Sequence, residues 1–123
     1  MLENIFLIAT AIIFLPYGIF CFLKPAMLSE AAGVSAVSST GTTELRAIYG
    51  GLQAAVGVLA IAAFFNSTLV DAFLVALITV SAGLLIGRTA GLIMDRGYTG
   101  YTGMALGFET LLLLGALYLY FVI

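Results

Sequence analysis

Arg88 lies in the middle of an apolar stretch, AGLLIGRTAGLIM, at residues 82–94. An arginine at membrane depth costs about 2.5–3.5 kcal/mol on insertion scales, so it requires a partner. Glu109, in the apolar stretch GFETLLLL, is the natural one, because a carboxylate can accept two hydrogen bonds from a single guanidinium. The pair could belong to a ligand site or serve only to fix helix register, and both interpretations stay open.

A second group of polar residues falls on one face of another apolar segment. Arg46, Tyr49 and Gln53 are spaced i, i+3 and i+7, which places them on one side of a helix. Counting from the helix ends puts Gln53, Arg88 and Glu109 at comparable depth. We therefore expect these residues to line one buried polar pocket. Glu44 is counted with these candidate residues; it points away from Arg46, and we expect its negative charge to interact favourably with the positive end of the helix dipole.

Other kinds of chemistry find little support in the composition. The chain has no histidine and one cysteine, Cys21, so we expect no metal site and no cofactor. The sequence offers no nucleophile with a neighbouring base, so an enzyme is the least favoured class of function. If the protein were an enzyme, Glu109 would act as its acid–base group. The net charge is −2 and there is no basic run, so we expect no nucleic-acid partner.

Apolar segments long enough to span a bilayer must position these residues. Of the 123 residues, 63% are hydrophobic and 8% charged, too few polar groups to cover a water-soluble globule. Four segments approach the ~20 residues that a membrane helix needs. We predict an all-α, polytopic membrane protein: a single domain over residues 1–123, built as a four-transmembrane-helix bundle with helices at about 4–23, 44–65, 68–94 and 101–122.

The first connection, KPAMLSEAAGVSAVSSTGTT, is the only long one. Residues of about 26–32 could form a short helix at the membrane interface, with Pro25 suited to its start and Gly33 to its C-cap. The remaining small and polar residues are expected to form a loop.

The basic residues predict an orientation. If the chain crosses the membrane four times, all four basic residues fall on the side of the first and third connections. These residues are Lys24, Arg46, Arg88 and Arg96. The positive-inside rule then makes that side cytoplasmic and places both termini outside.

Glycines recur at four-residue spacing, which brings small residues to one helix face and allows close approach of backbones. We expect them to pack helices within the chain, with a homo-oligomer interface as the less favoured alternative. The predicted packing residues are Gly50, Gly51, Gly83, Gly87, Gly91, Gly103 and Gly107.

Three strings, ELRAIYGGLQAAVGVL at 44–59, GLLIGRTAGLIMD at 83–95 and GFETLLLLGAL at 107–117, together resemble a bacterial family of small four-helix membrane proteins described only as a domain of unknown function. The resemblance runs from about Pro25 to the C-terminus, and the size and layout are broadly DoxX-like. It implies a bacterial cytoplasmic membrane protein but no activity. The positions that match the family are Glu44, Arg46, Gly50, Gly51, Arg88 and Glu109.

Two hypotheses for function lead. In the first, the polar pocket binds a small anionic or amphipathic molecule, such as a lipid or a quinone-like compound, and serves binding or transport. In the second, the chain is a structural or accessory subunit that packs on a membrane protein partner. The lipid bilayer is a partner in either case.

Overall fold

The computed structural model describes residues 1–123, which form helices joined by short connections. Four helical runs are long and apolar enough to cross a membrane, at Leu2–Leu23, Ser39–Phe65, Ser67–Asp95 and Gly100–Phe121. The predicted all-α class with four candidate membrane spans is therefore confirmed. The chain divides into two compact units, Met1–Thr68 and Leu69–Ile123.

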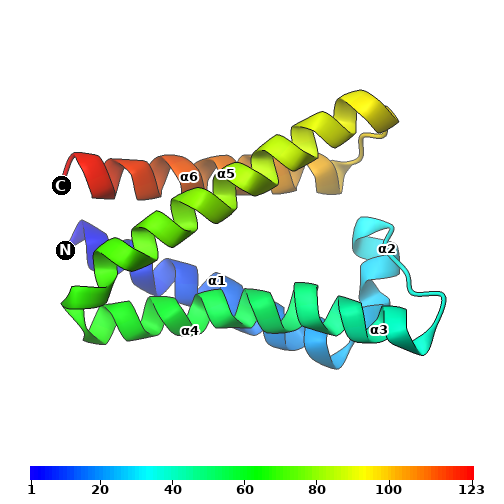
Figure 1. The fold of residues 1–123 in the computed structure, drawn as a ribbon, viewed down its shortest axis with the longest axis horizontal. Helices are drawn as coiled ribbons and strands as arrows, with labels where there is room; N and C mark the ends of the chain where they lie inside the picture. The colour runs from blue at the N-terminus through cyan, green and yellow to red at the C-terminus, as the bar shows by residue number, and fades with distance from the viewer. The chain divides into compact units, whose positions relative to one another are not determined.

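In the first unit, α1 (Leu2–Leu23) and α4 (Leu52–Phe65) lie side by side (Figure 1). Glycines allow the two backbones to approach closely. A Cβ added to Gly57 of α4 would lie 2.7 Å from the backbone nitrogen of Leu15, and one on Gly50, just before α4, would lie 2.8 Å from the Cα of Phe22. No side chain fits at either position without a shift of the opposite backbone.

The connection after α1 contains the short helix expected there. A 3-10 turn (η1, Pro25–Met27) leads into α2 (Leu28–Ala32), whose Leu28 is fully buried. Gly33 ends α2 in the left-handed conformation, with φ 72°, so the predicted cap is confirmed. This conformation suits glycine because it has no Cβ to clash with the following carbonyl.

A second helix replaces part of the predicted loop. Residues Ser39–Leu45 form α3, so the second membrane-length run begins at Ser39 and not near Glu44. Ser38 caps this helix by accepting a hydrogen bond of 3.1 Å from the backbone N–H of Gly41. The small polar residues that suggested a loop therefore supply a helix N-cap instead.

Between α3 and α4 lies a π-helical segment, η2 (Arg46–Gly51). The backbone N–H of Leu52 bonds to the carbonyl of Ala47, five residues back. A π turn holds more residues than an α turn, so the 100° spacing used to place Arg46 and Gln53 on one face does not apply across this segment.

The second unit consists of α5 (Val70–Asp95) and α6 (Gly100–Phe121), which lie side by side (Figure 1). The turn η3 (Ser67–Leu69) precedes α5. Arg96 ends α5 in the left-handed conformation, with φ 56°. Thr99 and Thr102 form a reciprocal capping box at the start of α6. The chain therefore reverses direction within residues 96–99.

The glycines of the second unit differ from those of the first. A Cβ on Gly83, Gly87 or Gly107 would meet nothing within 4 Å. Gly91 lies near only the carboxylate of Asp95 in its own helix, and Gly103 near the Tyr98 hydroxyl. Gly51 in η2 is likewise open except toward the Arg46 carbonyl. The packing role of these glycines stays a prediction.

Large apolar side chains point outward from α5 and α6. Ile86 is 71% exposed and Leu111 is also 71% exposed. Apolar side chains at this exposure are costly in water and favourable in hydrocarbon. Their distribution agrees with helices that use lipid as their solvent.

Candidate functional site

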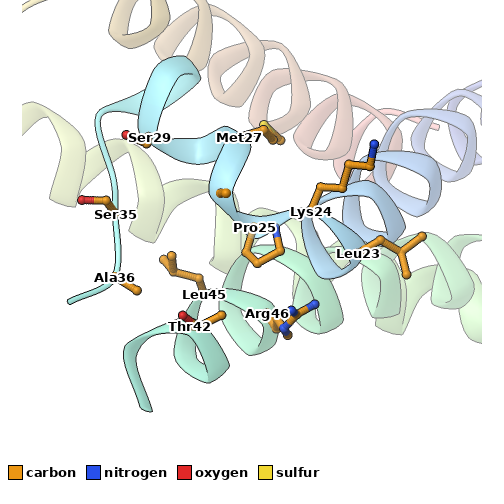
Figure 2. Close-up of a pocket in the computed structure, with 11 residues that line it drawn as sticks. Leu23, Lys24, Pro25, Met27, Ser29, Ser35, Ala36, Thr42, Leu45 and Arg46 are labelled. Carbon is orange, nitrogen blue, oxygen red and sulfur yellow. The ribbon is translucent and has the colours of Figure 1, made fainter. Parts of the chain in front are cut away.

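The first unit contains a pocket of about 590 Å³ at the end of α1 (Figure 2). Small-molecule sites in proteins are about 300–1,000 Å³, so the volume suits a ligand or the polar end of one. Its walls come from the end of α1, from η1 and α2, from the coil that follows, from α3 and from the start of η2. The lining residues are Leu23, Lys24, Pro25, Ala26, Met27, Ser29, Ser35, Ala36, Thr42, Leu45 and Arg46.

Local sequence explains how these walls form. Lys24 and Pro25 end α1, because a proline disfavours helical geometry in the residue before it. Leu28 is buried and anchors α2, and Gly33 turns the chain out of it. Ser38 then starts α3, which brings Thr42 opposite Pro25 across the pocket (Figure 2).

Arg46 lies at the edge of the pocket and is held by the end of α1. Its guanidinium donates a hydrogen bond to the carbonyl of Phe22 and lies 5.6 Å from the centroid of the Phe22 ring. The carbonyls of the last helical turn lack intrahelical partners, so this bond satisfies one of them. The ring face adds a cation–π attraction. No carboxylate forms an ion pair with Arg46.

Lys24 is the second basic residue of the pocket. Its side chain is exposed and makes no ion pair, and it extends away from the Thr42 side of the pocket (Figure 2). The lining contains no acidic residue. The pocket therefore carries two positive charges and no negative one.

Three hydroxyl groups complete the polar part of the lining. Thr42 donates to the Ser38 carbonyl at 3.3 Å, so its hydrogen is already engaged. The side chains of Ser29 and Ser35 make no hydrogen bond within the chain. Both serines therefore have a free donor for a bound molecule.

The predicted pair of Arg88 and Glu109 is present in the second unit. Arg88 Nε donates to Glu109 Oε1 at 2.9 Å, and Arg88 Nη2 donates to Oε2 at 2.8 Å. The side chains are 28% and 6% exposed, respectively. This two-pronged geometry is the strongest that a guanidinium and a carboxylate can form, and it links α5 to α6.

The other predicted site residues all lie in the first unit. Glu44 is exposed in α3, Tyr49 is half-buried in η2, and Gln53 is half-buried in α4. The side chain of Gln53 makes no hydrogen bond within the chain. Arg46 is the one predicted site residue that lines the pocket. The predicted cluster draws on both units, and as one cluster it stays a prediction.

Sequence reasoning did not select Lys24, Ser29, Ser35 or Thr42 as site residues. The available signal was the long connection itself, which starts with a basic residue and ends just before Arg46. A basic residue at both ends of an unusually long connection is the pattern that could have identified them.

A family model described as "Domain of unknown function (DUF4345)" matches residues 2–121. The chain therefore belongs to this family, and the resemblance seen in its sequence extends over the first helix as well. No curated protein and no solved structure matches the chain.

Proposed function

We propose that this member of the DUF4345 family is an integral membrane protein that binds an anionic amphiphile in the pocket of its first unit. One observation carries the proposal: Lys24 and Arg46 line a cavity of about 590 Å³ that contains no acidic residue. Neither cation has a carboxylate partner in the chain. An anion between them would supply the missing counter-charge.

Arg46 retains the capacity to bind an anion although it contacts Phe22. A guanidinium has five N–H donors, and the Phe22 carbonyl accepts from one of its nitrogens. The carbonyl and the ring face offset part of the charge without neutralising it. The remaining donors are those that a phosphate or carboxylate head group uses.

The position of the pocket suits an amphiphile. It lies directly after Leu23, the last residue of a membrane-length helix, where head groups meet the hydrocarbon. Leu23, Met27 and Leu45 offer apolar walls beside the two cations. In our proposal this end of α1 faces the cytoplasm of a bacterial cell and both termini lie outside, following the positive-inside rule.

In this proposal the Arg88–Glu109 pair has a structural role. Both oxygens of the carboxylate are bonded to Arg88, so the pair is electrically compensated. A compensated pair attracts an added anion far less than an uncompensated cation does. We assign it the task of holding α5 against α6.

Native mass spectrometry of the protein extracted with its lipids tests the proposal. The wild type should carry a bound amphiphile of negative charge. The double variant Lys24→Gln, Arg46→Gln should lose it, while Arg96→Gln, which removes a charge outside the pocket, should retain it. A wild type that never carries such a molecule, or a double variant that retains it fully, would contradict the proposal.

A further inference from the structure

The lining of the pocket favours one kind of head group. On the basis of the proposed function, we propose that the amphiphile is a lipid with a phosphate ester and no ammonium group. Phosphatidate and phosphatidylglycerol are lipids of this chemistry. Three properties of the lining support this choice: its free donors, the residue types it lacks, and its level relative to the membrane.

The free donors of the pocket outnumber what a carboxylate can accept. Ser29 and Ser35 bring one hydroxyl each, which is not used within the chain, and Lys24 lies at the rim, where its long, exposed side chain can turn its three N–H groups toward a bound molecule. Arg46 adds the donors that Phe22 leaves free. A carboxylate has two oxygens, whereas a phosphate ester adds further oxygens arranged tetrahedrally. A phosphate can therefore engage donors that come from several walls at once.

Two other classes of ligand, lipids with an ammonium head group and quinone-like ring compounds, do not fit the residue types of the lining. No aspartate or glutamate is present to pair with the ammonium of a choline or ethanolamine lipid. No phenylalanine, tyrosine or tryptophan lines the pocket, so neither an aromatic cage for an ammonium nor a platform for a quinone-like ring is present. Of the ligands considered from sequence, the anionic lipid fits and the ring compound does not.

The depth of the pocket relative to the membrane favours a lipid over a free anion as the ligand. The 22 residues of α1 rise about 33 Å at 1.5 Å per residue, close to the ~30 Å of bilayer hydrocarbon. The residues that follow Leu23 are therefore at the depth of lipid phosphates. Because apolar walls adjoin the cations, the binding of a lipid-borne phosphate also buries part of its glycerol and first chain carbons.

Titration of the purified protein in a neutral detergent tests this choice. The probes are dimyristoyl phosphatidate, dimyristoyl phosphatidylglycerol, dimyristoyl phosphatidylcholine, myristate and inorganic phosphate, with binding followed by calorimetry. We expect the two anionic phospholipids to bind at least tenfold more tightly than phosphatidylcholine and myristate. Millimolar inorganic phosphate should fail to displace them.

Substitutions tie that selectivity to the pocket. Lys24→Gln with Arg46→Gln should reduce the affinity for phosphatidate to that for phosphatidylcholine, whereas Arg96→Gln should leave it unchanged. Circular dichroism shows whether each variant remains helical. If Arg46→Gln is unfolded, the single variant Lys24→Gln is used to test the selectivity. The Lys24 side chain is exposed and forms no hydrogen bond or ion pair within the chain.

Each outcome separates this inference from the function on which it rests. Myristate that binds as tightly as phosphatidate would overturn the phosphate class and leave the binding of an anionic amphiphile intact. Displacement by inorganic phosphate would overturn the lipid source. Equal binding of phosphatidylcholine would overturn the exclusion of ammonium head groups. If no anionic probe binds, the proposed function itself fails.

Discussion

The two units of this protein use the same residue types in different ways. In the first unit, glycines lie where α1 meets the run from η2 to α4, and its arginine, Arg46, has no carboxylate partner. In the second unit, the glycines of α5 make no close contact with α6, and the arginine within the helix, Arg88, forms a two-pronged ion pair. The first unit contains close backbone contacts at its glycines, and the second contains an ion pair between its two helices.

This difference underlies our assignment of a structural role to Arg88 and of a binding role to Arg46. An arginine whose charge is compensated in the chain stabilises the fold, whereas one left uncompensated at a pocket is available to a ligand. In the same way, a glycine in close contact with another helix of its own unit is needed for packing there, and a glycine without such a neighbour is not needed for packing within its unit. Each contrast can be tested with matched substitutions.

The largest effect is expected from Glu109→Ala, which leaves Arg88 without its partner. Removal of one member of a buried pair costs about 3–5 kcal/mol, and the partial exposure of Arg88 places this loss near the lower end. Unfolding of the purified protein in detergent, followed by circular dichroism, measures it.

A double-mutant cycle gives the control for this prediction. Arg88→Met combined with Glu109→Leu removes both charges, so we expect a loss of less than about 1.5 kcal/mol. Losses from the single substitutions Arg88→Met and Glu109→Leu that simply add in the double variant would mean that the pair does not couple α5 to α6.

The second effect comes from glycine substitutions. Gly57→Ala would put a Cβ 2.7 Å from the Leu15 backbone nitrogen, and overpacking of this kind costs about 1–3 kcal/mol. Gly87→Ala meets nothing within 4 Å, so it should be neutral or gain up to about 1 kcal/mol from helix propensity. Thermal unfolding of the two variants side by side checks the contrast; equal losses would refute it.

The smallest effects are expected at the two left-handed residues. Gly33→Ala should cost about 1 kcal/mol through backbone strain alone, because its Cβ would meet no other atom. Arg96→Asn should gain about 0.5 kcal/mol, since asparagine tolerates this conformation better than arginine. The sign of each change in unfolding free energy is the readout, and a gain at Gly33 or a loss at Arg96 would contradict the account.

Part of this architecture could be predicted from sequence because it depends on local pattern or on strong chemistry. Apolar runs of membrane length identify the spans. A buried arginine and a buried glutamate must be compensated, so the Arg88–Glu109 pair follows from energetics. Gly33 after a short polar helix predicts a cap because few other residues adopt its backbone conformation.

The pocket could not be predicted in the same way. It depends on how a twenty-residue connection folds back, which is set by Ser38 starting a helix and by Leu28 anchoring another. The π segment Arg46–Gly51 changes the register of the following helix, and a periodicity of 100° per residue does not reveal it. The cap at Ser38 is a local signal, but the pocket that it helps to form depends on contacts between segments that are far apart in the sequence.

The central claim is that Arg46 serves a ligand and Arg88 serves the fold. Measuring phosphatidate affinity and unfolding free energy on the same two variants, Arg46→Gln and Arg88→Gln, tests it most directly. We predict that Arg46→Gln loses at least tenfold in affinity and only the stability that its contacts with Phe22 contribute, and that Arg88→Gln loses more stability but binds as the wild type does while folded. Retained affinity in Arg46→Gln together with lost affinity in folded Arg88→Gln would contradict it.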